Sequence, residues 1–133
     1  MIAVIIPFFL SCDPIVQMEA NIENLTSKNL TIDFISWDSS SNKTLQTDPG
    51  QTVLFEIYDG YGTYVEPNLE DYDSVLIKNQ ADEVLKVYKR NDTGKNIFNI
   101  DEYWISSEPS KRVFKYEYEI EEVDIEKVFM PID

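Results

Sequence analysis

The stretch Lys111-Arg112-Val113-Phe114-Lys115-Tyr116-Glu117-Tyr118-Glu119-Ile120 gives the clearest indication of the fold. From Phe114 onward, apolar and aromatic side chains occupy every second position and charged ones lie between them. Alternation with a period of two is typical of a β-strand that buries one face. We therefore predict a strand over residues 111–120 whose apolar face contributes much of the core.

The same alternation recurs in short segments separated by turn-forming residues, which is typical of an all-β sandwich. Helical periodicity is almost absent. Only residues 121–129, where acids lead and Lys127 trails as the helix dipole prefers, predict one or two helical turns. The predicted strands cover residues 18–26, 29–37, 43–47, 51–59, 74–79, 83–90 and 111–120.

Period-two alternation also predicts which side chains face the core. The adjacent Phe34 and Ile35 break the pattern and favour a bulge before Trp37. Residues 96–105 show no clear pattern, and residues 106–110, interrupted by a proline, are predicted to form a loop. The expected inward residues are Val53, Phe55 and Ile57 on one strand, and Val75, Ile77, Leu85 and Val87 on the hairpin formed by 74–79 and 83–90.

The composition limits the function. The chain has 25 acidic and 11 basic residues and a net charge of −14, which disfavours nucleic acid as a partner and electrostatic attachment to anionic membranes. The absence of histidine excludes Ser-His-Asp and Cys-His catalysis and imidazole-bound metals. A single cysteine excludes an intrachain disulfide. Hydrophobic residues make up 43% of the chain, enough for the core of one domain.

Residues 2–10 are apolar and uncharged, as in a signal-peptide core, and too few to span a bilayer. The following Leu10-Ser11-Cys12 resembles the bacterial lipobox, although Phe9 replaces the usual leucine and residues 1–11 lack a basic residue. The resemblance implies a signal peptide over 1–11 and a lipidated Cys12. A short tether over 12–17 and a single domain over 18–133 would follow. The alternative is a buried N-terminal strand with an unmodified cysteine.

Three segments resemble those of small, uncharacterised lipoproteins of Bacteroidetes-type bacteria. They are Asn29-Leu30-Thr31-Ile32, Asp73-Ser74-Val75-Leu76-Ile77 and the ending that runs from Tyr116 to Asp124. The resemblance implies an antiparallel β-sandwich, immunoglobulin-like or related, and supplies no catalytic residues. It also implies a lipid-anchored protein of the bacterial cell envelope, at the outer membrane.

Two short motifs are candidate sites. Tyr58, Asp59, Tyr61 and Tyr64 lie in a glycine-containing segment where tyrosine rings could stack on sugars while the carboxylate accepts hydroxyl hydrogen bonds. The alternative is that these rings pack over one end of the sandwich. Asp73-Ser74-Val75 resembles the Asp-Ser/Thr-aliphatic motif of Bacteroidetes O-glycosylation, which makes Ser74 a candidate glycan attachment site, or simply the start of a strand.

Acidic residues also gather at Glu66, Glu70, Asp71 and Asp73, but their spacing does not fit a calcium-binding loop, so we predict no metal and no cofactor. The sequence thus favours a non-enzymatic binding or structural module. Its predicted partners are the membrane, through the lipid anchor, and a glycan or an envelope protein, with no nucleic acid. The alternative is a carboxylate-dependent glycan hydrolase.

Overall fold

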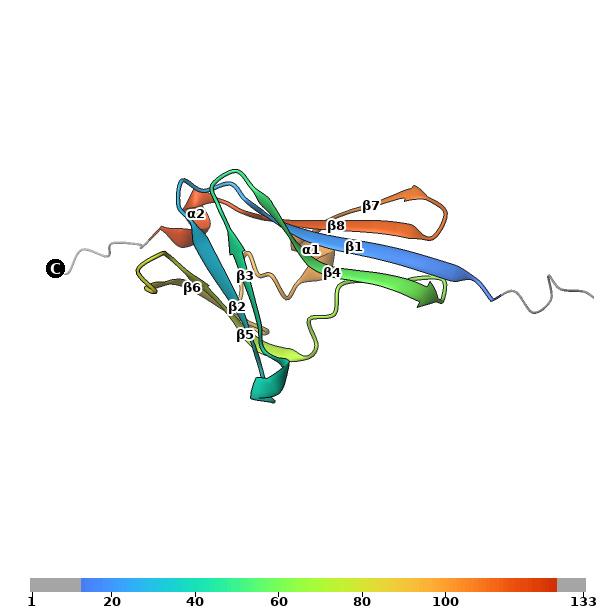
Figure 1. Ribbon diagram of the computed structural model, residues 1–133, viewed down its shortest axis with the longest axis horizontal. Coiled ribbons are helices and arrows are strands. Elements are labelled where there is room, and N and C mark those ends of the chain that lie inside the picture. Colours follow the sequence, from blue (N-terminus) through green and yellow to red (C-terminus); the bar gives the residue numbers. More distant parts are fainter. Residues whose placement is uncertain (1–12, 127–133) are drawn as a thin grey trace, which may run out of the picture.

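The computed structural model describes residues 13–126 and forms two four-stranded sheets (Figure 1). One sheet has the order β4-β1-β8-β7 and the other the order β3-β2-β5-β6. The predicted all-β sandwich is confirmed. Its elements are β1 (Ile15–Asn24), β2 (Leu30–Ser36), the 3-10 helix η2 (Ser39–Ser41), β3 (Lys43–Thr47), β4 (Thr52–Tyr61), β5 (Tyr72–Lys78), β6 (Val84–Lys89), α1 (Ile100–Tyr103), β7 (Ile105–Ser110), β8 (Val113–Ile120) and α2 (Glu122–Ile125).

The first and last strands lie side by side in the middle of one sheet. β1 pairs with β4 in the antiparallel sense and with β8 in the parallel sense, whereas the other pairings are antiparallel. β1 begins at Ile15, so residues 15–17 belong to the sheet and the predicted tether over 12–17 is too long. The alternation predicted for residues 111–120 is confirmed, because Tyr116, Tyr118 and Ile120 are buried.

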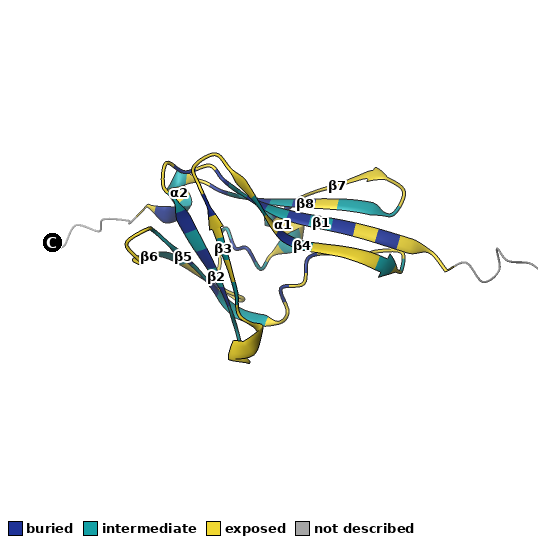
Figure 2. Cartoon of the chain, in the orientation of Figure 1, coloured by how far each residue is buried: buried dark blue, intermediate teal, exposed yellow. Residues whose placement is uncertain are grey.

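The core lies between the sheets, where alternate residues of the facing strands are buried (Figure 2). Phe34 of β2 and Phe55 of β4 meet across the two sheets with ring centroids 4.7 Å apart. Trp104, which follows α1, lies 6.1 Å from Phe55 and 5.5 Å from Tyr118 between ring centroids. Its Nε1 donates a hydrogen bond to the carbonyl of Ile97 at 2.7 Å. This indole therefore packs against the sheet that contains β4 and β8 and joins it to the segment that precedes β7.

A bulge in β4 makes the predicted inward position of Ile57 wrong. The pairing with β1 shifts between Ala20 and Asn21, so that the ladder skips Phe55. An extra residue in one strand exchanges the faces of the residues beyond it. Phe55 is buried, but Ile57 lies on the outer face of the sheet and is 68% exposed.

A second shift changes the hairpin of β5 and β6. Val75 and Ile77 are buried and Leu85 packs partly against the core, as predicted. The register changes just after Ile77, and Tyr88 stands opposite Val75. Tyr88 is therefore buried and Val87 is exposed, so the predicted inward position of Val87 is wrong. The bulge expected before Trp37 is confirmed, because β2 and β5 change register just before Ser36.

The segment 106–110 is a strand, and its prediction as a loop is wrong. β7 is an edge strand in which every residue is exposed, and its pairing with β8 shifts between Ser107 and Ser110. Pro109 lies within this shift, where a missing backbone N–H costs little. The predicted helical turn after β8 is confirmed as α2, which is held by an ion pair of 2.6 Å between Lys95 Nζ and Asp124 Oδ2.

Candidate functional site

The four predicted glycan-binding residues divide between two sides of the sheet. On β4, Asp59 stands opposite Gln17 and Tyr61 opposite Ile15, both residues that point away from the core. Tyr58 stands opposite the buried Met18 and so takes the inner side. Successive strand residues alternate between faces, so the carboxylate and the ring next to it in sequence cannot form one platform.

Tyr64 lies on the inner side of the same sheet. Its ring meets the edge of Phe114 at 5.2 Å between centroids. Its hydroxyl is hydrogen-bonded to Glu66 Oε2 at 3.1 Å and lies 3.2 Å from the hydroxyl of Tyr116. The structure thus brings together Asp59 and Tyr61, which share the outer face, and separates them from Tyr58 and Tyr64.

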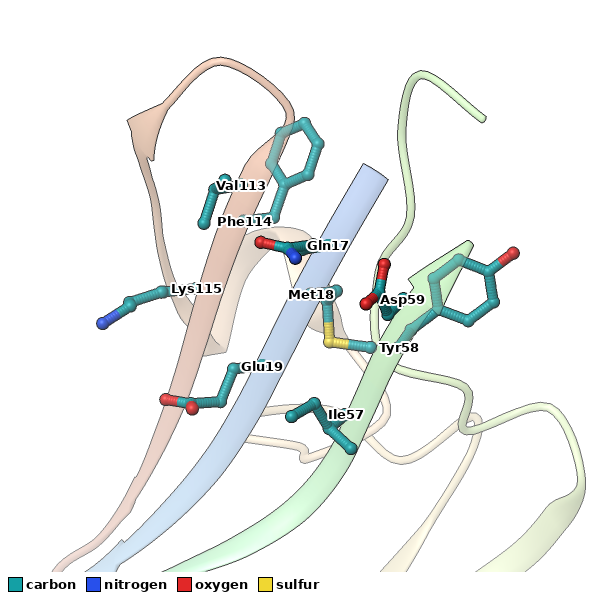
Figure 3. A pocket seen from close by; sticks show the side chains of 9 residues that line it. All are labelled: Gln17, Met18, Glu19, Ile57, Tyr58, Asp59, Val113, Phe114 and Lys115. Carbon is teal, nitrogen blue, oxygen red and sulfur yellow. The ribbon is translucent and has the colours of Figure 1, made fainter. Parts of the chain in front are cut away.

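The outer face around Asp59 contains a shallow depression of about 200 Å³ (Figure 3). Tyr58 lines it together with Asp59, as do the other two inward residues of these strands, Met18 and Phe114. The outward side chains that line it form two rows across three strands. In the first row Gln17 of β1 stands between Asp59 of β4 and Val113 of β8. In the second row Glu19 of β1 stands between Ile57 of β4 and Lys115 of β8. We call these six residues the outer-face grid: Gln17, Glu19, Ile57, Asp59, Val113 and Lys115.

The outer-face grid offers several kinds of contact at fixed spacing. Neighbouring strands are about 4.8 Å apart and alternate residues along a strand about 7 Å apart, so its amide, carboxylates and ammonium are held on a rigid support. Ile57 and Val113 add apolar surface beside these polar groups. This arrangement suits a ligand that presents hydroxyl or charged groups beside small apolar faces. A pyranose ring or a polar protein surface has that character.

Of the six residues of the outer-face grid, only Asp59 is a candidate site residue from the sequence alone. Gln17 is assigned to the tether and Ile57 to the core, and both assignments change because β1 starts early and β4 contains a bulge. Lys115 is correctly placed on the polar face of its strand, but its neighbours depend on the parallel pairing of β1 with β8. Such a long-range pairing leaves no local signal in the sequence.

Beyond the outer-face grid, the same surface becomes acidic. Glu23 and Glu119 stand opposite each other on β1 and β8, and Glu117 is one step away on the same face. A hydrogen bond to Glu23, partial burial and the negative charges of Glu23 and Glu119 raise the pKa of Glu117 to about 7. Glu117 therefore binds its proton more tightly than an ordinary glutamate.

The raised pKa of Glu117 predicts a pH-dependent stability. Because the pKa of Glu117 rises from its ordinary 4.5 to about 7 on folding, the folded state binds more protons between these values, and the free energy of unfolding falls as pH rises through them. After allowance for solvent screening, Glu117→Gln should raise this free energy by about 0.5–1 kcal/mol at pH 8 and hardly at all at pH 5. Urea titrations at both pH values measure this change in the free energy of unfolding. Glu70→Gln is the control in an exposed loop, and equal gains in both variants would contradict the assignment.

The remaining candidates show no assembled site. Within residues 13–126, no group of three or more acidic or cysteine side chains is arranged to hold a metal. Glu66 is hydrogen-bonded to Tyr64, and Asp71 accepts from Asn68 at 2.9 Å. Ser74 lies half-buried in β5, and its hydroxyl donates to Asp73 at 3.2 Å.

The predicted signal peptide and lipidation site fall in a part of the chain that the structure does not describe. Residues 1–11 and Cys12 are outside the described residues. Among residues 13–126, the helices are too short and too polar to cross a membrane. Comparison with protein-family models, curated proteins and solved structures finds no match to this chain.

Proposed function

We propose that this chain is a lipoprotein of the bacterial cell envelope, anchored at the outer membrane by lipid on Cys12. Its β-sandwich would act as a non-enzymatic binding module for a glycan or an envelope protein. The outer-face grid is the proposed binding surface, and the observation that carries this assignment is the arrangement of its six side chains in two rows on three adjacent strands.

The start of β1 supports the anchoring. Ile15 follows Cys12 by three residues, so an extended chain places its Cα within about 11 Å of the cysteine. Two or more acyl chains give a stable membrane attachment where one does not. A lipidated Cys12 would therefore hold β1, and the sheet built on it, close to the bilayer.

The character of the outer face supports a binding role. Leu54 and Ile57 are 45% and 68% exposed on it, beside the polar members of the outer-face grid. Water covers these apolar groups in the isolated protein, and a partner that displaces the water gains stability. The polar side chains would select that partner through hydrogen bonds and charge.

The carboxyl groups favour binding over hydrolysis. Glycoside hydrolysis uses two carboxyl groups about 5 to 9.5 Å apart on either side of the scissile bond. Glu23 and Glu117 are instead hydrogen-bonded to each other and cannot flank a sugar bond. Their place on an open sheet face also gives little exclusion of water. A general acid in such a place would act weakly.

Retention on a panel of immobilised envelope polysaccharides, together with co-purification of envelope proteins, tests the binding surface. Lys115→Ala and Asp59→Asn are each expected to weaken retention of the partner about tenfold, because each removes a hydrogen bond to a charged group. Lys89→Ala, on an exposed position of the other sheet, is the matched control. A partner held equally by all variants would place binding elsewhere, and release of reducing sugar from the panel would establish the hydrolase.

A further inference from the structure

One end of the sheet β4-β1-β8-β7 brings three chain segments together (Figure 1). They are the start of β1, the end of β4 and the turn between β7 and β8. The backbone N–H of Gly62 donates to the carbonyl of Pro14 at 2.9 Å, and Arg112 Nε donates to the carbonyl of Ile15 at 3.1 Å. This end is therefore a defined part of the fold, and the chain enters it three residues after Cys12.

This end exposes two large apolar side chains beside two basic residues. Ile15 is 57% exposed and Tyr61 74% exposed, and the two stand opposite each other in the β1–β4 pair. Lys111 is exposed and Arg112 half-buried in the neighbouring turn. We call these four residues, Ile15, Tyr61, Lys111 and Arg112, the anchor-side tip.

The charge at the anchor-side tip is also distinctive. Asp13 and Glu108 lie nearby in sequence and balance the two basic residues, in a chain whose net charge is −14. Glu108 accepts a hydrogen bond from the backbone N–H of Arg112, which occupies one of its oxygens. The tip is thus near neutral and partly apolar, while the remaining surface is strongly acidic.

We propose that the anchor-side tip rests on the lipid headgroups of the membrane that holds Cys12, which fixes the orientation of the domain as well as its position. This inference rests on the proposed lipid anchor. Tyrosine and basic side chains are favoured at membrane interfaces, where a ring or alkyl stem contacts acyl chains and the polar end stays with the headgroups. Tyr61 would then contact lipid rather than the ligand, in keeping with its absence from the lining of the depression.

The acidity of the domain strengthens this orientation. An anionic membrane repels the acidic surfaces of the sandwich more strongly than it repels the near-neutral tip. A domain held by a short tether therefore has its lowest electrostatic energy when the anchor-side tip faces the membrane. The outer-face grid, which starts two residues after Ile15, would stand just above the headgroups and face sideways.

The full lipidated chain permits a site-specific test because Cys12 is its only cysteine. Tyr61→Cys and Thr52→Cys place a new thiol on the same face of β4, at its two ends, about 30 Å apart. Each variant is labelled with a maleimide fluorophore and reconstituted in vesicles of phosphatidylethanolamine and phosphatidylglycerol. The label at position 61 is expected to be quenched by aqueous iodide about threefold less than the label at position 52, because interfacial groups are buried among headgroups.

The controls separate this inference from the proposed function. If wild-type protein denatured in sodium dodecyl sulfate reacts with the maleimide, Cys12 is not a thioether, and both proposals fail. If wild type is inert but both labels are quenched equally, the anchor stands and the contact of the tip is overturned. Lower quenching at position 61 alone supports the contact.

A charge reversal provides a second measurement in the Tyr61→Cys background. Lys111→Glu is expected to weaken the contact of the tip at least about fivefold in vesicles that contain phosphatidylglycerol, and to have little effect in vesicles without it. Lys89→Glu makes the same change of charge in the other sheet and should leave the quenching unchanged. Equal effects of the two reversals would show that net charge, and not the tip, determines the quenching.

Discussion

Replacing Cys12 with alanine is expected to move the protein from the membrane fraction to the aqueous fraction without unfolding it. Lipid on this cysteine is the only membrane attachment that the sequence predicts, and each buried methylene of an acyl chain contributes about 0.8 kcal/mol. The fold should persist because the described core lies between Val16 and Ile125.

Detergent phase partitioning and metabolic acyl labelling measure this change, and circular dichroism checks the fold. Ser11→Ala is the matched control, because alanine keeps a small residue before the cysteine and should preserve both labelling and partitioning. If the Cys12→Ala variant remained in the detergent phase, the anchor assignment would be wrong.

Trp104→Ala is expected to reduce the free energy of unfolding by about 3–5 kcal/mol, a large part of the total for a domain of this size. The indole is 4% exposed, contacts Phe55 and Tyr118, and donates a hydrogen bond to Ile97. Its removal leaves a cavity between the sheets and an unpaired carbonyl. Urea denaturation followed by far-ultraviolet circular dichroism gives the change.

Trp37 provides a control of the same residue type, because it is 80% exposed at the end of β2. Trp37→Ala should change the free energy of unfolding by no more than about 0.5 kcal/mol. Trp104→Phe should fall between the two alanine variants, since it keeps a ring and loses the hydrogen bond. Equal losses at positions 37 and 104 would contradict the packing described for the core.

Local alternation was enough to predict most strands, and its failures have one physical origin. Residues 43–47 match β3, and residues 111–120 contain β8, because their patterns are set by one buried face. Ile57 and Val87 lie on the face opposite to the predicted one because the bulges lie in the pairing of two strands. Such a bulge is a property of both strands together.

The candidate site was less predictable than the fold for a related reason. Asp59 and Lys115 are 56 residues apart in sequence and are brought together only because β1 lies between β4 and β8. The parallel pairing of β1 with β8 joins the two ends of the chain, and no turn signal announces it. Conversely, Tyr58 and Asp59 are adjacent in sequence and point to opposite faces.

The double pairing of β1 also has a mechanical consequence. A pull on Cys12 would act along the axis of β1, whose hydrogen bonds to β4 and β8 run roughly across that direction. Both ladders would then be loaded in shear, with many bonds sharing the tension, instead of opening one by one from an end. Resistance to force depends on the rate of unfolding. A domain tethered through this central strand should therefore resist a pulling force from a bound partner better than a domain tethered through an edge strand such as β7.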